Sequence, residues 1–321
     1  MDWRAFTWES HLQQEMLQRI DVKYRQLLSM RPISSAALAR IRDGFAMEWT
    51  YHSNSIEGNT LTLQETRLVL EDGITVGGKS LREHFEILNH HDAISFIEKQ
   101  AQKGYRLNAG DILSVHRLVL QRIEKEFGGR YRNSGARITG ANFTPPNALR
   151  VDGLMEELLS WVNAEQNVPL PVKATIFHHR FVWIHPFFDG NGRTVRLLFN
   201  LLLMSEGYPP AIILQQDRKK YYDALNKANN GSYEKLVTLV LQALERSLDI
   251  YISQLNNTYE DFRPISTIVE EEKLPYGQEY ISLLVRQGKI AGYKEGKNWL
   301  TTEDAILTYM DKRKRIRKAA K

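Results

Sequence analysis

Apolar residues recur along most of the chain at intervals of three and four, the spacing that places them on one face of a helix. The pattern predicts helices within residues 1–50 and at Leu61–Asp72, 81–103, 109–126, Leu154–Val162, Val172–Ile184 and Leu236–Leu255. Pro32 interrupts the first segment, and the serines that follow it can cap a second helix over Ala36–Trp49. We therefore expect a mainly α-helical protein.

Residues 127–146 depart from this pattern. Gly, Asn and Ser surround a short apolar run, and Pro145 and Pro146 close the segment. This composition predicts a small β-hairpin or an extended flap, with a long loop as the alternative.

The C-terminal segment, residues 263–321, has its own organisation. Two short helices, Ile265–Lys273 and Gln278–Gln287, precede two short strands around Gly296 and Lys297 and a last helix that ends near Met310. This order resembles a small winged helix-turn-helix domain of the excisionase or MerR kind. We expect three parts: N-terminal helices over 1–110, a core over 111–255 and this domain.

Charge is placed unevenly along the chain. Residues 263–321 hold 13 Lys and Arg against 8 Asp and Glu, whereas residues 1–262 hold 30 of each. The last ten residues, from Lys312 to Lys321, include seven basic side chains. Such a tail suits contacts with phosphate. Winged helices also bind proteins, so a DNA partner and a protein partner both stay open.

The overall composition is that of an ordinary globular protein, with 42% hydrophobic and 25% charged residues among 321. The absence of cysteine excludes disulfides, thiol chemistry and a Cys-rich zinc site. No apolar run approaches the length of a membrane span, and the N-terminus has no signal-peptide core. We therefore expect a cytoplasmic location and no membrane contact.

The stretch from His185 to Arg196, sequence HPFFDGNGRTVR, concentrates reactive side chains. An apolar run to Met204 follows and predicts a helix whose N-terminus begins at the Gly-Asn-Gly turn. Free N–H groups and the helix dipole at such a terminus favour an anion. Two arginines three residues apart lie on one face of the first turn and suit a polyphosphate. Asp189 can hold Mg²⁺ beside a phosphate, and His185 can accept a proton near neutral pH.

This stretch resembles the signature HxFx[D/E]GNGRxxR of the Fic (filamentation induced by cAMP) family, with every fixed position filled. Members with the full signature are similar to protein adenylyltransferases, which move AMP from ATP to a Ser, Thr or Tyr hydroxyl and release pyrophosphate. Doc-type relatives, which phosphorylate instead, lack the second glycine of the turn. The presence of Gly192 therefore favours AMP transfer.

The resemblance implies a role for each residue. His185 is the general base, Asp189 holds Mg²⁺, and Arg193 and Arg196 bind the β and γ phosphates of ATP. In the family, residues 127–146 form a flap that pairs with the target segment and borders the nucleotide. The remaining nucleotide-binding positions implied are Gly190, Asn191, Gly192, Thr194, Val195, Ile138, Thr139, Gly140, Ala141, Tyr222 and Asn229.

A second motif precedes the first. Taken alone, Ser53 to Gly58 is typical of a helix end with a glycine stop. In a Fic protein it resembles the inhibitory motif [S/T]xxxE[G/N], filled by Ser53, Glu57 and Gly58. The resemblance implies that Glu57 pairs with Arg196 and takes the guanidinium that the γ-phosphate needs.

Two other patterns give weaker evidence of a functional site. Gly73–Ser80 satisfies the P-loop pattern literally, but that motif requires a buried strand before it, whereas Leu61–Asp72 has helical spacing. We expect a solvated loop there. His84, His90 and His91 fit neither one helical face nor a known zinc ligand set, so packed or surface histidines are expected.

Several alternatives stay open at the level of sequence. An enzyme that removes AMP, with Glu57 positioning a water, would carry the same motifs. A DNA-binding regulator whose core only senses nucleotide would account for the basic tail. The resemblance implies a target protein with a modifiable hydroxyl, with self-modification included. The oligomeric state is undetermined, and a homo-oligomer is one option.

Overall fold

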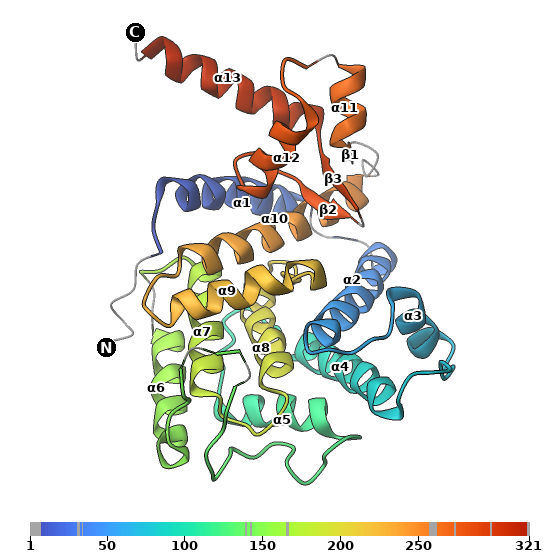
Figure 1. Ribbon diagram of the computed structural model, residues 1–321, viewed down its shortest axis with the longest axis vertical. Helices are drawn as coiled ribbons and strands as arrows, with labels where there is room; N and C mark the ends of the chain where they lie inside the picture. The colour runs from blue at the N-terminus through green and yellow to red at the C-terminus, as the bar shows by residue number, and fades with distance from the viewer. Residues whose placement is uncertain are drawn as a thin grey trace. The chain divides into compact units, whose positions relative to one another are not determined.

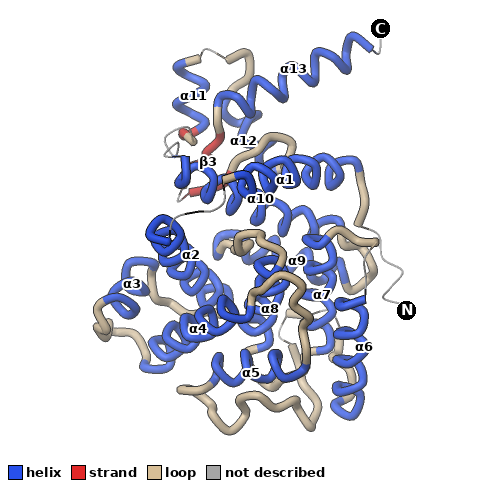
Figure 2. The backbone as a smooth tube through the Cα atoms, turned by 180° about the vertical axis from the view of Figure 1, so that it is seen from behind, coloured by secondary structure: helices blue, strands red, loops and turns tan. Residues whose placement is uncertain are grey.

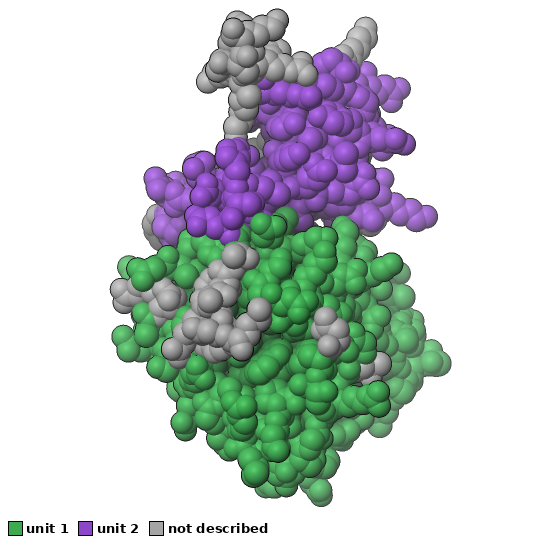
Figure 3. Space-filling model, turned by 60° about the vertical axis from the view of Figure 1, so that its left-hand side comes forward, with its two compact units in different colours: residues 1–8, 38–240 green, residues 9–37, 241–321 purple. Residues whose placement is uncertain are grey.

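The computed structural model describes residues 8–30, 33, 35–138, 140–141, 143–164, 167–256, 262–272, 274–295 and 297–319. The described part of the chain is mainly helical, which confirms the predicted fold class, and Figure 2 shows its few strands near the C-terminus. The chain divides into two compact units: residues 1–8 with 38–240, and residues 9–37 with 241–321. Figure 3 colours them separately.

The first unit is built from helices that follow one another along the chain (Figure 1). They are most of α2 (Ser35–Ile56), then α3 (Leu63–Glu71), α4 (Leu81–Gln100), α5 (Ala109–Leu120), α6 (Val151–Ala164), α7 (Leu170–Ile184), α8 (Asn191–Ser205), α9 (Arg218–Ala228) and the start of α10 (Glu234–Asn256). Two short 3-10 turns, Ala148–Arg150 and Gln215–Asp217, precede α6 and α9.

Helix α8 is the centre of this unit. Nearly all of its residues are buried, and it packs against α4, α5 and α7 (Figure 1). A helix that is buried on every side belongs to a core rather than to a surface. The polar side chains of its first two turns are therefore held in a rigid interior, and only its N-terminal end opens toward the loop before it.

Local sequence signals set the starts of α3 and α4. Thr62 and Glu65, and likewise Ser80 and Glu83, each form a capping box in which both side chains bond the backbone of the other residue. The box at Ser80 ends the Gly73–Ser80 segment, which is a loop before a helix as expected. Helix α2 continues past the predicted end at Trp49, so that Ser53 lies on its last turn.

The described residues between 127 and 147 form an extended loop rather than the predicted hairpin. None of the described residues in this range lies in a strand. The backbone N–H of Arg132 donates to the Pro186 carbonyl, outside the segment, instead of to a facing arm. Pro145 and Pro146 have no N–H to offer a ladder. The hairpin part of the prediction was therefore wrong, and the described residues fit the extended flap or long loop that was the other option.

The second unit contains α1 (His11–Ser29), the end of α10 and the C-terminal elements. These are β1 (Arg263–Pro264), α11 (Ile265–Glu271), α12 (Gln278–Arg286), β2 (Tyr293–Glu295), β3 (Asn298–Thr301) and α13 (Glu303–Ala319). The strands form an antiparallel sheet in the order β1-β3-β2. A buried apolar cluster joins the helices to the sheet; it contains Ile265, Ile268, Ile281, Leu284, Val285, Ile290 and Ile306.

The two helices, two strands and final helix follow the predicted order, and β1 adds a strand that was not expected. Gly296, at the predicted turn between the strands, lies outside the described residues, as do the side chains of 314–321 in the basic tail. The winged-helix class, and a DNA or protein partner for it, stay predictions. Among the helices of the described residues, none is long and apolar enough to cross a membrane.

Candidate active site

The loop between α7 and α8 begins with a strained residue. His185 follows the last residue of α7 with φ 50° and ψ 61°, in the left-handed region. It is the one non-glycine residue of the described chain with positive φ. That conformation costs an ordinary residue about 1–2 kcal/mol, so the surroundings must hold it. Its backbone N–H donates to Phe181 O at 2.9 Å.

Arg132, which the sequence analysis did not single out, holds this strained residue. Its side chain is 2% exposed, and Nε donates to His185 O at 2.7 Å. The other guanidinium nitrogens also donate to backbone carbonyls, those of Ser134, Pro146 and Ile184. Arg132 therefore ties both ends of the flap segment to the loop that carries His185.

Asn191 and His116 fix the rest of the loop. Asn191 Oδ1 accepts from Phe187 N at 2.9 Å, and Asn191 Nδ2 donates to Phe187 O at 2.8 Å. The His116 ring stacks on Phe187 at 3.5 Å between centroids. Gly129 N–H donates to His116 Nδ1, so Nε2 carries the proton that reaches Asp189 O at 3.0 Å. Burial lowers the pKa of His116 to about 4, which keeps this ring neutral.

Helix α8 begins without a side-chain cap. Gly190, the N-cap residue, has φ 73°, a conformation that glycine adopts without strain. Because Gly190 has no side chain, it cannot cap the first N–H groups of the helix. The carboxylate of Glu57 lies directly over Gly192, where an added Cβ would overlap Glu57 Oε1. The structure thus brings the predicted inhibitory glutamate to the predicted anion site.

The same carboxylate pairs with Arg196. Glu57 Oε1 lies 2.8 Å from Arg196 Nη1, so the contact predicted between these two residues is present. Arg196 Nε donates to Ser53 Oγ at 3.0 Å, and Nη2 donates to Ser53 O at 2.7 Å. Gly58, with φ 105°, makes the turn that follows. The three residues of the inhibitory motif and Arg196 therefore meet at one place.

Arg196 is 3% exposed, and its charge depends on these contacts. Burial is the largest influence and lowers the pKa of Arg196, but Glu57 together with Tyr221 and Tyr222 more than offsets it, so the pKa lies above its usual value. A buried guanidinium that loses its carboxylate partner needs another anion. The site is therefore suited to exchange one anionic partner for another.

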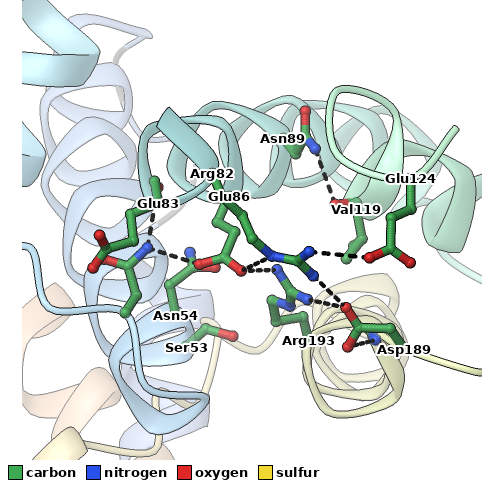
Figure 4. Close-up of polar contacts among 12 residues, drawn as sticks. Ser53, Asn54, Arg82, Glu83, Glu86, Asn89, Val119, Glu124, Asp189 and Arg193 are labelled. Carbon is green, nitrogen blue, oxygen red and sulfur yellow. Dashed lines mark hydrogen bonds and ion pairs between the residues drawn. The ribbon is translucent and has the colours of Figure 1, made fainter. Parts of the chain in front are cut away.

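Arg193 belongs to a second charge network, drawn in Figure 4. Arg193 Nη1 lies 3.2 Å from Glu86 Oε1, and Nη2 lies 3.5 Å from Asp189 Oδ2. Asn59, just after the inhibitory turn, donates from Nδ2 to Glu86 Oε2 at 2.9 Å. Arg82 of α4 reaches Asp189 Oδ2 at 2.9 Å. The two motif arginines thus have separate carboxylate partners, Glu57 and Glu86.

His185 is half-buried and electrostatically tuned. Burial is the main cause that lowers the pKa of His185, to about 4, and the positive charge of Arg132 adds to it. The Val182 backbone, Glu57 and Asp189 act in the opposite sense by less. The imidazole is therefore neutral at pH 7 and can accept a proton.

The two residues predicted for an adenosine pocket lie on or next to α9. The Arg218 guanidinium lies over the Tyr222 ring, 5.2 Å from its centroid, and Arg218 Nε donates to Ile56 O at 2.7 Å. Tyr222 therefore borders the residue before Glu57. Asn229 Oδ1 accepts from His179 Nε2 at 2.9 Å, which fixes the orientation of its amide.

The other predicted positions differ in what they can offer. Thr194 and Val195 are fully buried in α8, so their side chains face the core, and only their backbone lies near the helix end. In the flap, Ala141 N–H donates to Ile138 O at 3.3 Å, and Gly140 O accepts from Asn226 Nδ2 at 3.4 Å. Thr139 lies outside the described residues.

Comparisons with known proteins agree with this geometry. A profile of the Fic/DOC family matches residues 106–203. A solved Fic domain containing signaling protein from Bacteroides thetaiotaomicron is 30% identical with a TM-score of 0.68, and the match covers 74% of this chain and 97% of that one. Fic-1 from C. elegans is 31% identical with a TM-score of 0.68, over 77% of this chain and 73% of the other. The chain therefore belongs to the Fic/DOC family.

Curated relatives carry the name protein adenylyltransferase Fic. The protein of that name from Aedes aegypti is 39% identical over 89% of this chain and 57% of its own length. The one from Culex quinquefasciatus is 39% identical over 82% of this chain and 52% of its own length. The chain thus spans little more than half the length of these relatives.

Proposed function

We propose that this protein is an adenylyltransferase that transfers AMP from ATP to a Ser, Thr or Tyr hydroxyl of a target protein or of itself. The names of the curated relatives support this activity. The complete signature from His185 to Arg196, held in one rigid loop and helix start, supports it independently.

In this proposal His185 is the general base. It accepts the proton of the attacking hydroxyl, the hydroxyl oxygen forms a bond to the α-phosphorus, and the bond to pyrophosphate breaks. A neutral imidazole is required for the first event, and the lowered pKa of His185 provides it at pH 7. Arg132 holds the strained backbone of His185 by its hydrogen bond to His185 O, and this in turn fixes where the His185 ring lies.

The N-terminus of α8 is the proposed phosphate cradle. Gly190, the N-cap residue, has no side chain to cap the first N–H groups, and Gly192 has none between its backbone and the place that the Glu57 carboxylate occupies, so an anion that replaced Glu57 could approach the backbone there. Arg193 and Arg196 add two charges from the same turn. Tyr222, Asn229 and the flap residues from Ile138 to Ala141 are proposed to border the nucleoside.

Asp189 is the residue that would hold Mg²⁺. Its carboxylate is 41% exposed, and Asp189 directly precedes Gly190, the N-cap residue of the proposed phosphate cradle. Within the described part of the chain, no three His, Cys, Asp or Glu side chains gather into a complete metal-binding set. One carboxylate fits, because Mg²⁺ commonly takes one or two from the protein and completes its shell with phosphate oxygens and water. When bound, the ion neutralises phosphate charge.

One observation carries the regulatory part of the proposal: Glu57 occupies Arg196 and covers Gly192 at the same time. A phosphate cannot reach either group while the carboxylate is there. We propose that Glu57 inhibits the enzyme by this competition, and that its displacement activates transfer. A charge-assisted hydrogen bond is worth about 1.5–3 kcal/mol, or roughly 10- to 100-fold in productive binding of ATP.

Labelling with [α-³²P]ATP tests the proposal. Glu57→Gly should incorporate AMP into itself and into proteins of a cell extract at least about tenfold faster than wild type. Glu57→Gly/His185→Ala should incorporate none, although it should still bind ATP. Equal labelling by wild type and Glu57→Gly would contradict the inhibitory role.

Two further outcomes have their own meaning. Label from [γ-³²P]ATP instead of [α-³²P]ATP would identify a kinase. Release of free AMP from labelled protein by wild type, lost in Glu57→Gly, would identify AMP removal as the activity of the inhibited form. Intact mass spectrometry distinguishes these cases, because only AMP transfer adds the mass of one AMP.

A further inference from the structure

The carboxylate of Asp189 lies against a guanidinium that is not part of the Fic signature. Arg82, on the first turn of α4, places Nη2 2.9 Å from Asp189 Oδ2 (Figure 4). The same oxygen lies 3.5 Å from Arg193 Nη2, and the other oxygen, Oδ1, accepts from Gly190 N–H at 2.6 Å. Protein donors therefore face both oxygens of the residue proposed to hold Mg²⁺.

The two arginines that share Asp189 differ in burial. The Arg193 side chain is 4% exposed and is packed against Glu86, whereas the Arg82 side chain is 49% exposed. A buried guanidinium cannot leave its carboxylates without a large desolvation cost. An exposed one moves at little cost, because surface ion pairs are weak and water replaces them.

Arg82 also has other carboxylates within reach. Its Nη1 lies 3.0 Å from Glu124 Oε1, and its Nε lies 3.7 Å from Glu86 Oε1. If the guanidinium turns away from Asp189, its charge stays paired with these two side chains. The structure thus contains both the contact that occupies Asp189 and an alternative position for the group that makes it.

We propose that Arg82 is a positioning residue that competes with the divalent cation for Asp189: it orients the carboxylate before the cation binds and moves toward Glu124 when it does. The inference rests on the proposed function, in which Asp189 holds Mg²⁺. It makes the inhibited site doubly occupied, since Glu57 covers Arg196 and Arg82 covers Asp189. The two contacts come from different segments of the chain and can be removed one at a time.

We expect Arg82 to affect how much the metal strengthens nucleotide binding, and not the affinity for the nucleotide without metal. An exposed pair of this kind shifts an affinity by a few-fold, and removing a positive charge beside a dication adds to that shift. We expect loss of the guanidinium to strengthen the contribution of the metal by about 3- to 10-fold. A residue that binds phosphate would act in the opposite sense, because its loss would weaken nucleotide binding with or without metal.

Calorimetric titration with α,β-methylene-ATP, which cannot donate AMP, tests this without any turnover. The dissociation constant is measured in EDTA and in excess Mn²⁺. The value in EDTA divided by the value in Mn²⁺ reports how much the metal strengthens binding. The comparison is made between Glu57→Gly and Glu57→Gly/Arg82→Gln, since Glu57 is removed from both. The ratio should rise by about 3- to 10-fold in the second protein.

Arg122 provides the matched control. Its Nη1 lies 2.7 Å from Asp92 Oδ2, and its side chain is 40% exposed. Among the described residues it has no contact with Asp189. Glu57→Gly/Arg122→Gln should leave the ratio unchanged, and Glu57→Gly/Arg82→Lys should stay close to the parent because it keeps the charge. An unchanged ratio in the Arg82→Gln protein overturns the role of Arg82 alone. Absence of any binding to Glu57→Gly would overturn the proposed function and this inference with it.

Discussion

Glu57 Oε1 lies 2.8 Å from Arg196 Nη1, and the same oxygen lies where a side chain on Gly192 would begin. One carboxylate therefore covers two groups that a polyphosphate would use: the charged side chain and the open backbone of the first helical turn. The two residues come from segments separated by more than a hundred positions, so the contact is a property of the fold.

The close approach to Gly192 predicts a conditional effect of Gly192→Ala on stability. In wild type the added methyl overlaps Glu57 and should destabilise the protein by about 1–3 kcal/mol. In Glu57→Gly the severe overlap is gone and the nearest atom to the added Cβ is Arg196 Nη1 at 3.0 Å, so the same substitution should destabilise the protein by less than about 1 kcal/mol, partly because alanine favours a helix. Urea unfolding of the four proteins measures the coupling. Additive effects would contradict the contact.

The tuning of His185 predicts the pH dependence of transfer. With its pKa lowered to about 4 by burial and by Arg132, the base is deprotonated throughout pH 5–8. Self-labelling by Glu57→Gly should therefore show no acid limb above pH 5, whereas an ordinary histidine would lose activity below about pH 6.5. Arg132→Met should move the acid limb to higher pH as well as slow transfer.

Proton NMR of the His185 ring gives a control for that prediction. The ring should titrate near pH 4 in Glu57→Gly and at a higher pH in the Arg132→Met form. If both proteins titrate at the same pH, Arg132 acts only by holding the backbone, through the bond from Nε to His185 O.

Substitution of Asn191 should show how strongly activity depends on the rigidity of the loop between α7 and α8. Asn191→Ala leaves the buried N–H and C=O of Phe187 without partners, which should cost about 2 kcal/mol of stability and roughly 100-fold in transfer by Glu57→Gly. Asn200 is the matched control, because it bonds N–H and C=O of Ala211 in the same way from the same helix. Asn200→Ala should lose similar stability but far less activity, as measured by urea unfolding and labelling. Equal losses of activity would contradict the positioning role.

A buried charge cluster in the second unit predicts acid sensitivity. Glu245 bonds Arg19 at 2.8 Å and Lys23 at 3.0 Å. Burial opposes ionisation, but these two charges prevail and lower the pKa of Glu245 to about 2 from 4.5. The stabilising contribution is therefore fully present above pH 4.5 and is lost as the pH falls through 2. Glu245→Gln should destabilise the protein by about 3 kcal/mol at pH 7.

Asp249 should affect the pH dependence of folding stability in the opposite sense to Glu245. Burial raises the pKa of Asp249 to about 6, so its protonation favours the folded state as the pH falls below 6. Thermal unfolding between pH 7 and 3 should show that the difference between wild type and Glu245→Gln shrinks at low pH. A constant difference would contradict the ionised state of Glu245 in the folded protein.

The positions of the helices and the signature loop could be predicted because they depend on local signals. Apolar spacing and the glycines of the turn are both visible in a few consecutive residues. The pairing of Glu57 with Arg196 was implied by the family resemblance, and the structure has the contact. The described residues of the flap segment form no hairpin, and Arg132 instead bonds the carbonyls of Ile184 and His185 as well as two carbonyls within the segment, which no local pattern records.

The residues that the sequence analysis missed share one property. Arg132, His116, Arg82 and Glu86 act through partners that are far away along the chain. An arginine or histidine at such a position has no spacing that distinguishes it from an ordinary surface residue. Only Arg132 gave a weak signal by its place, because it lies within the glycine-rich flap segment.

The proposed inhibition requires that Glu57 denies Arg196 to the terminal phosphate of ATP. Titration calorimetry of wild type and Glu57→Gly with ATP and with AMP, each in the presence of Mg²⁺, measures this competition. Glu57→Gly should bind ATP about 10- to 100-fold more tightly than wild type and AMP with almost the same affinity, because AMP has no phosphate that extends to Arg196. Equal affinities of both proteins for ATP, or an equal gain for ATP and AMP, would contradict the claim.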